Sequence, residues 1–367
     1  MEKLKAVVLV SENASEQVKH TLQWWKRNTQ ADEAGALSEV DCVFIFAEKP
    51  EQFKSLSLQA RNEYPVAVRV LVLDSSSHVN VDQVAAHIAV TAFDDDHLRY
   101  IEASLDRINA LDVPSDMRRW LCQMETVPVI KGVYLSLIKA LKSDEPDLDM
   151  IIDCIGKDQF LLMKLLQSAN SCQFSNAKSV YDIRQAVMRI GLERLYYLVI
   201  VVGVFSSTSD LDEYKRSAAL STAFDVAFWS QRIAIEMGVS RADCDSAYLA
   251  GLLHNLGQTL VHEKELASLS LDAAFQLSTC ESQAGAFWLA LWGMPSVVVE
   301  AVAHQFSNQL SFETNPVTSA ISVGRSVESL RVSGMPMMSS LEQYQCEHEE
   351  EEQKLHKALE ALEANAF

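Results

Sequence analysis

The sequence predicts an α/β domain with a parallel sheet, followed by a domain built from helices alone. Over residues 1–112, short and continuously apolar runs alternate with amphipathic segments, a pattern typical of a parallel sheet covered on both faces. From about residue 115 the strand signals largely vanish and apolar residues recur at helical spacing. The 367 residues include only 12 Gly and 8 Pro, which disfavours a turn-rich all-β fold.

Strands and helices alternate regularly in the first domain. Three apolar runs predict buried strands, at 7–10 (VVLV), 42–46 (CVFIF) and 66–73 (VAVRVLVL). Helical spacing predicts helices over 15–27, 50–63, 81–90 and 95–108, the second of them opened by Pro50.

This alternation resembles that of response-regulator receiver domains, which have a flavodoxin-like fold; a generic α/β module is the alternative. Receiver domains hold Mg²⁺ with acids after the first strand, and an Asp that ends the third strand takes the phosphoryl group. Here only Glu12 follows the first strand, Phe46 stands at the phosphoacceptor position, and Thr91 lies near the expected lysine position. Phenylalanine cannot be phosphorylated, so the resemblance implies a pseudo-receiver over 1–112.

The helical part is predicted to extend over 113–335, with an acidic C-terminal helix or tail over 336–367. Successive short helices are expected at 148–156 and 158–169, the second opened by an Asp N-cap, and a buried helix at 195–205. The C-terminal helix is expected over 341–362. Such a helix would suit a partner-facing or oligomerising element, but its apolar residues form only a narrow stripe, which favours a solvated terminal helix. The run of acids indicates a solvated helix face. The stripe is Leu355, Leu359 and Leu362, and the acids are Glu347, Glu349, Glu350, Glu351 and Glu352.

Charge and cysteine usage exclude several classes of protein. A formal net charge of −19 disfavours direct binding to nucleic acid. No apolar run approaches the roughly 18–20 residues that span a bilayer, so no membrane insertion is expected. Seven cysteines without a CxxC pair, mostly in apolar surroundings, indicate a reducing cytoplasm. The GxSxG, GxxxxGK[ST], GxGxxG and HExxH motifs are absent from the sequence.

Four ordered blocks carry a second resemblance. They are 165–171 (LLQSANS), 179–192 (SVYDIRQAVMRIGL), 248–257 (YLAGLLHNLG) and 291–305 (LWGMPSVVVEAVAHQ). In this order they resemble HDOD domains, catalytically degenerate relatives of the HD and HD-GYP phosphohydrolases. Physical chemistry gives their framework residues structural roles: a left-handed helix cap for Asn170, turns or close helix contacts for the glycines, and a fixed helix end for Trp292 and Pro295. The framework residues are Asn170, Ser171, Gly191, Gly251, Gly257, Trp292 and Pro295.

HD phosphohydrolases bind one or two metals through His and Asp side chains. The resemblance puts an amide, Asn255, at the Asp of the His-Asp pair, and an amide oxygen is a far weaker ligand than a carboxylate. The resemblance therefore implies a site without catalysis, metal or cofactor. The positions of the degenerate site are Thr222, His254, Asn255, Glu281, His304 and Gln305.

His254, His304 and Glu281 remain weak candidates for a Zn²⁺ site. The competing interpretation makes His254 a buried, hydrogen-bonded core histidine and His304 a partly exposed one.

The resemblance implies a non-enzymatic bacterial signal-transduction protein, whose HDOD module acts as a regulatory or scaffold domain for a protein partner. Two alternatives remain open. One is a residual metal-dependent phosphohydrolase, and the other is a nucleotide sensor that uses the vacated pocket.

Overall fold

The structure is a computed structural model that describes residues 6–10, 32–33, 40–47, 49–72, 88–90, 95–111, 113–123, 132–143, 145–170, 180–207, 213–260 and 277–364. The helix predicted over 15–27 lies outside the described residues, as do Glu12, Thr91 and Ser171. The chain folds as two compact units. One contains residues 1–129 and 261–299, and the other contains residues 130–260 and 300–367.

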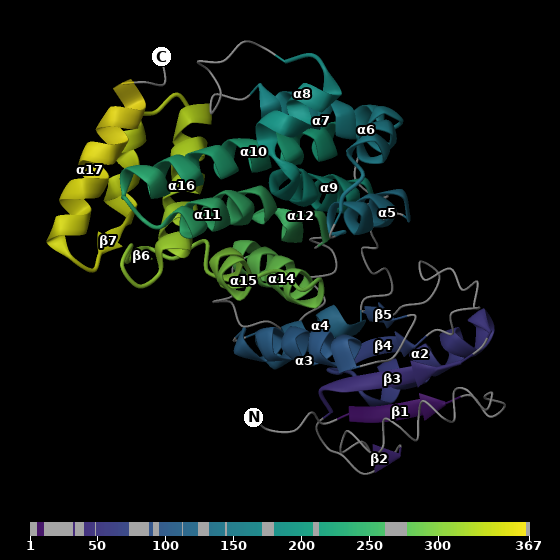
Figure 1. Ribbon diagram of the computed structural model, residues 1–367. Helices are drawn as coiled ribbons and strands as arrows, with labels where there is room; N and C mark the ends of the chain where they lie inside the picture. Colours follow the sequence, from purple (N-terminus) through teal and green to yellow (C-terminus); the bar gives the residue numbers. More distant parts are fainter. Residues whose placement is uncertain are drawn as a thin grey trace. The chain divides into compact units, whose positions relative to one another are not determined.

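The first unit contains a five-stranded sheet in the order β2-β1-β3-β4-β5, with every pair of neighbours parallel (Figure 1). This is the strand order of flavodoxin-like folds. Phe46 is the last residue of the central strand, β3. The strands are β1 (Ala6–Val10), β2 (Asp32–Glu33), β3 (Cys42–Phe46), β4 (Val68–Val72) and β5 (Ile88–Val90). The helices with described residues in this unit are α2 (Pro50–Glu63), α3 (Asp95–Ala110), α4 (Ser115–Gln123) and α14 (Leu277–Leu291), and α15 (Ser296–Ala303) begins in it.

The parallel sheet predicted from the sequence is confirmed, with one wrong element. The strands at 7–10 and 42–46 and the helix at 50–63 lie where the sequence predicts them, while the strand predicted over 66–73 is formed over Val68–Val72. The helix predicted over 81–90 is wrong at its end, because Ile88–Val90 forms β5 and pairs with β4. These apolar residues suit either structure, and the open edge of β4 offers backbone partners that decide for the strand.

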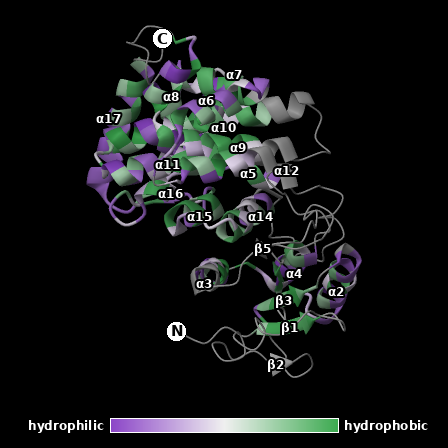
Figure 2. Ribbon diagram, turned by 45° about the vertical axis from the view of Figure 1, so that its right-hand side comes forward, coloured by the Kyte–Doolittle hydropathy of each residue, from purple (hydrophilic) through white to green (hydrophobic). Residues whose placement is uncertain are grey.

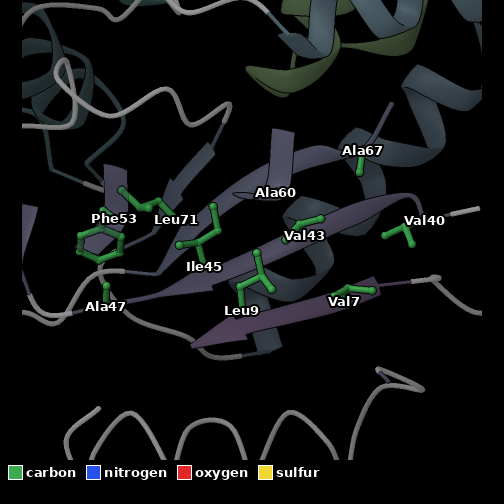
Figure 3. Packing of buried hydrophobic residues seen from close by; sticks show 10 residues of the cluster. All are labelled: Val7, Leu9, Val40, Val43, Ile45, Ala47, Phe53, Ala60, Ala67 and Leu71. Carbon is green, nitrogen blue, oxygen red and sulfur yellow. The ribbon is translucent and has the colours of Figure 1, made fainter. Parts of the chain in front are cut away.

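One face of the sheet packs on α2. Side chains alternate between the two faces of a strand, so every second residue of β1 and β3 points toward the helix. Figure 3 shows Leu9 and Ile45 of the strands on the same side as Phe53, and all three are almost completely buried. The hydropathy colouring of Figure 2 shows both strands as continuously hydrophobic, as expected of strands that are buried on both faces.

Polar contacts join helix α4 to β4 and to the residues just before it. The guanidinium of Arg69, which is only 1% exposed, donates to the backbone carbonyl of Cys122 in the last turn of α4. A cation at this place compensates the negative end of the helix dipole. Burial lowers the pKa of Arg69 to about 10, which leaves it charged at neutral pH. Arg118 also donates from Nε to the carbonyl of Val66 over 3.3 Å.

The second unit is almost entirely helical, as the sequence predicts for this part of the chain. No helix among the described residues of the protein is both long enough and apolar enough to cross a bilayer. The elements of the second unit begin with α5 (Gly132–Leu141), α6 (Leu148–Gly156), α7 (Gln159–Ala169), α8 (Ile183–Ile190), α9 (Leu192–Ser207), α10 (Glu213–Glu236), α11 (Arg241–Leu253) and α12 (Leu256–Leu260). They continue with β6 (Gln309–Leu310), α16 (Pro316–Val332), the 3-10 helix η3 (Met337–Gln343), β7 (Gln345–Cys346) and α17 (Glu349–Ala364).

Helix α10 is the central helix of this unit, with α11 and α16 packed against it (Figure 1). Both contacts depend on glycine. A Cβ on Gly251 of α11 would lie 2.6 Å from the Cα of Ala227, and a Cβ on Gly324 of α16 would lie 2.5 Å from the Oγ of Ser230. A buried hydrogen bond of 3.1 Å from the Trp229 indole to the carboxylate of Glu328 also joins α10 to α16.

The C-terminal helix differs from the prediction. It begins at Glu349 rather than at 341, because residues 337–343 form η3 and 345–346 form β7. Its apolar stripe is buried, so the expectation of a solvated terminal helix is wrong, while Glu347, Glu349, Glu350 and Glu352 of the acidic run are exposed, as expected of a solvated helix face. Glu351, in the acidic run, accepts hydrogen bonds from the backbone N–H groups of Phe312 and Glu313, and Lys354 donates to the carbonyl of Met237. The helix is thus part of the packed unit.

We expect Gly251→Ala to lower the free energy of unfolding by about 2–3 kcal/mol, because the methyl group would overlap the backbone of α10. Urea unfolding followed by circular dichroism measures this. Gly156→Ala is the matched control, since its Cβ would lie 3.5 Å from Ile183, an ordinary contact. Equal effects of the two substitutions would contradict the close approach of α11 to α10.

Candidate functional site

His254 and Asn255 lie at the break between α11 and α12. His254 is the C-cap residue of α11, and Asn255 follows it directly. The two side chains are 8% and 2% exposed. The break turns both of them into the helical core rather than along a helix surface, so their chemistry depends on the groups packed around them.

The imidazole of His254 is oriented by its own helix. Its Nδ1 lies 2.7 Å from the carbonyl oxygen of Gly251. A carbonyl accepts only, so Nδ1 carries the proton and Nε2 has the free lone pair. Burial first, and the positive charge of Arg325 second, lower the pKa of His254 to about 3 against the opposing effect of the bond to Gly251. The ring is therefore neutral at physiological pH.

Asn255 ties the break to α10. Its Nδ2 donates to the carbonyl of Ala219 over 2.7 Å, and its buried Oδ1 has no hydrogen-bond partner among the described residues. An aspartate at this position would direct an oxygen, not an N–H, at the Ala219 carbonyl. The amide thus fits the contact that a carboxylate would not.

Gln305 connects the end of α15 to the break between α11 and α12. Its Nε2 donates to the carbonyl of His254 over 2.8 Å and to that of Val302 over 3.0 Å. Its own carbonyl accepts from Nη1 of Arg325 over 3.2 Å. The Arg325 guanidinium also lies 3.8 Å from the ring centroid of Phe306. The structure therefore brings together three of the predicted positions, His254, Asn255 and Gln305, with Arg325 beside them.

The other predicted positions contribute differently. Thr222 is exposed, and its hydroxyl donates to the carbonyl of Ala218. His304 is exposed at the end of α15, while Glu281 lies half-buried on α14 in the first unit. In the described part of the chain, no three His, Cys, Asp or Glu side chains gather closely enough to hold a metal ion.

The framework residues show one correction. Asn170 caps α7 as predicted, but with a φ of −104° it is not left-handed. Its side chain instead bridges to Val180 through two 2.7 Å hydrogen bonds, which fix the start of the segment leading into α8. Gly191 ends α8 with a φ of +82°, as a turn glycine does.

Gly257 is buried in α12, and Gly251 makes the close contact with α10. Trp292 and Pro295 lie between α14 and α15. Trp292 is half-buried with its ring centroid 6.3 Å from that of Trp288, and the carbonyl of Pro295 accepts from the N–H groups that start α15.

The described residues of this site do not fit a divalent cation. The His254 ring has the orientation typical of a metal ligand, with Nδ1–H on a carbonyl. However, its neighbours Asn255 and Gln305 are neutral amides whose N–H groups are committed to carbonyls, and Arg325 adds a positive charge. A divalent ion requires anionic or at least several neutral donors, and a nearby guanidinium repels it.

Arg325 is the residue that sequence reasoning missed. It lies on α16, beyond the blocks that carry the family resemblance. The signal available was an arginine that follows a glycine in an otherwise small and apolar run, AISVGRSV. A glycine in such a run allows close helix packing, so the arginine beside it is expected to contact a neighbouring helix.

Comparisons with known proteins agree with the sequence resemblance. Residues 127–307 match the HDOD domain family. An uncharacterised protein of Treponema pallidum (strain Nichols) is 30% identical over 141 residues, which cover 38% of this chain and 26% of that protein. The match thus spans about a quarter of the length of that relative.

Two solved structures resemble the chain at low identity. An HDOD domain protein of unknown function from Geobacter sulfurreducens is 15% identical, with a TM-score of 0.47 over 71% of this chain and 95% of its own. A Shewanella amazonensis SB2B protein, provisionally described as a metal-dependent phosphohydrolase, is 17% identical, with a TM-score of 0.43 over 72% of this chain and 98% of its own.

The neutral state of His254 predicts a specific pH dependence. Its pKa is about 3 in the folded chain and 6.5 when unfolded, so its contribution to stability is present above pH 6.5 and lost as the pH falls toward 3. Between pH 7 and pH 5 this loss amounts to about 2 kcal/mol.

We expect His254→Asn, which keeps an N–H for the Gly251 carbonyl but cannot titrate, to lose about 2 kcal/mol less than the wild type over this interval. Urea unfolding followed by circular dichroism at both pH values measures the difference. An identical pH dependence of the two proteins would show that His254 is not buried in its neutral form.

Proposed function

We propose that the protein, whose residues 127–307 match the HDOD domain family, is a non-enzymatic component of bacterial signal transduction. In this proposal the HDOD region acts in the cytoplasm as a regulatory or scaffold module that relays a signal to a protein partner. The observation that carries the proposal is that the N–H groups of the His254, Asn255 and Gln305 side chains are each committed to a backbone carbonyl, of Gly251, Ala219 and His254 respectively. Side chains engaged in this way support shape rather than chemistry.

The electrostatics of the site also support a role without hydrolysis. A metal-dependent phosphohydrolase needs a cation that activates water and neutralises the phosphate charge. Here the cation beside His254 is the fixed guanidinium of Arg325, which does not acidify water as a metal ion does. With a pKa lowered to about 3, His254 is too weak a base to compensate, and the Asn255 amide is not a base.

The N-terminal domain is proposed to be a pseudo-receiver that supplies the input. The flavodoxin-like strand order supports this, and so does the place of Phe46 at the carboxyl end of the central strand. Phe46 is 1% exposed, so this side chain fills the core where a phosphoacceptor would face solvent. An input to such a domain does not pass through phosphorylation of this residue.

We expect the purified protein to hold substoichiometric metal and to leave a generic phosphodiester, bis(p-nitrophenyl) phosphate, intact with added Mn²⁺. In Asn255→Asp, the new carboxylate faces the Ala219 carbonyl, so the free energy of unfolding falls by about 2–4 kcal/mol and Mn²⁺ does not restore it. Elemental analysis measures the metal content, and thermal unfolding with and without Mn²⁺ measures the stability of the variant. Stoichiometric metal with turnover that disappears in His254→Ala contradicts the proposal.

The second candidate function is a nucleotide sensor. The buried, unpaired Oδ1 of Asn255 favours it, because this oxygen is positioned to accept from an N–H group of a ligand. A ligand that binds the folded state raises the unfolding midpoint with its concentration. A midpoint that rises with a nucleotide supports the sensor, and a constant midpoint across a nucleotide panel supports the scaffold.

A further inference from the structure

Helix α14 lies within the segment that matches the HDOD family, yet it packs against α3 of the N-terminal α/β region. The two helices form one compact unit with the parallel sheet. Helix α3 buries a stripe at helical spacing: Ile101, Ser104, Leu105 and Ile108. On α14, Phe287, Trp288 and Leu291 are likewise almost completely buried.

The end of α14 depends on Tyr100 of α3. Gly293 ends the helix with a φ of +71°, the N–H of Met294 bonds to the carbonyl of Leu289, and the N–H of Gly293 bonds to that of Ala290. This Schellman arrangement leaves the carbonyl of Leu291 without an intrahelical partner. The Tyr100 hydroxyl donates to that carbonyl over 2.6 Å.

Gly293 is required at this place for a second reason. A Cβ on it would lie 2.6 Å from Cε2 of Tyr100, so the aromatic ring occupies the space that any other side chain would need. The tyrosine therefore touches α14 twice, through its hydroxyl at Leu291 and through its ring at Gly293. Together these contacts define where α14 stops and in which direction the chain leaves it.

The chain then runs directly to the candidate site. Helix α15 begins at Ser296, three residues after Gly293, and ends at Ala303, and Gln305 follows two residues later. The side-chain Nε2 of Gln305 donates to the backbone carbonyl of His254. Since a helix of eight residues is stiff along its axis, a change at its first residue is carried to its last.

We propose that the contact of Tyr100 with Leu291 and Gly293 couples the N-terminal α/β region to the HDOD site, with α15 as the connecting element. The inference rests on the proposed regulatory function and deepens it, because it names the path by which an input reaches the module. Loss of the Tyr100 contact makes the start of α15 more mobile and weakens the hydrogen bond from Gln305 to the carbonyl of His254.

Hydrogen–deuterium exchange of the full chain tests this coupling without any partner, so its failure is separable from failure of the proposed function. In Tyr100→Phe, which removes only the hydroxyl, we expect amides of α15 and residues 304–307 to exchange about three to ten times faster, as for the loss of one hydrogen bond. Peptides from β3 and α10 keep their wild-type rates. Gly293→Ala produces the same pattern through the overlap with the tyrosine ring.

The chain offers a matched control for each variant. Tyr181→Phe removes a hydroxyl from a tyrosine that is 84% exposed. Gly334→Ala places alanine at a φ of +68° in an equivalent helix end, where a Cβ would meet nothing within 4 Å. Neither control changes α15. Faster exchange confined to residues 100–104 and 289–294 overturns the proposal, as does unchanged exchange or a uniform increase along the whole chain.

Discussion

The side-chain amide of Gln305 is the point on which the helical site depends. It donates to the carbonyl of His254, 51 residues away in sequence, and to that of Val302 in its own segment. This amide joins the break between α11 and α12 to the end of α15, and the backbone carbonyl of Gln305 accepts from Arg325 of α16. A carboxylate at this position would not donate to the two carbonyls, so the connection depends on the amide.

Close packing around α10 makes this connection rigid. Gly251 and Gly324 allow α11 and α16 to approach α10 until backbone atoms touch, which brings His254 and Arg325 to the same region of the unit. Burial then keeps His254 neutral, and Asn255 satisfies a carbonyl of α10. Asn255 and Gln305, two of the positions that differ from the HD pattern, thus each have a partner in the helical core, and they form contacts between helices.

Local patterns predicted much of this from the sequence. Apolar runs located β1 and β3, and helical spacing located α2. The edge strand β5 was mispredicted because three apolar residues carry too little periodicity to separate a strand from a helix end, and pairing with β4 decides. The burial of α17 and the role of Arg325 depend on packing between distant segments, which a single sequence does not reveal. The same holds for Tyr100, whose partners lie 191 and 193 residues further along the chain.

The nitrogen chemical shifts of the His254 imidazole test most directly whether this histidine is buried and neutral. They are measured by ¹⁵N NMR of the full chain from pH 8 to pH 5, with and without Mg²⁺ or Zn²⁺. We expect a single neutral tautomer with the proton on Nδ1, unchanged over this range and unaffected by either metal. Titration of the ring near the ordinary histidine pKa of 6.5, or a shift of Nε2 on addition of metal, would contradict it.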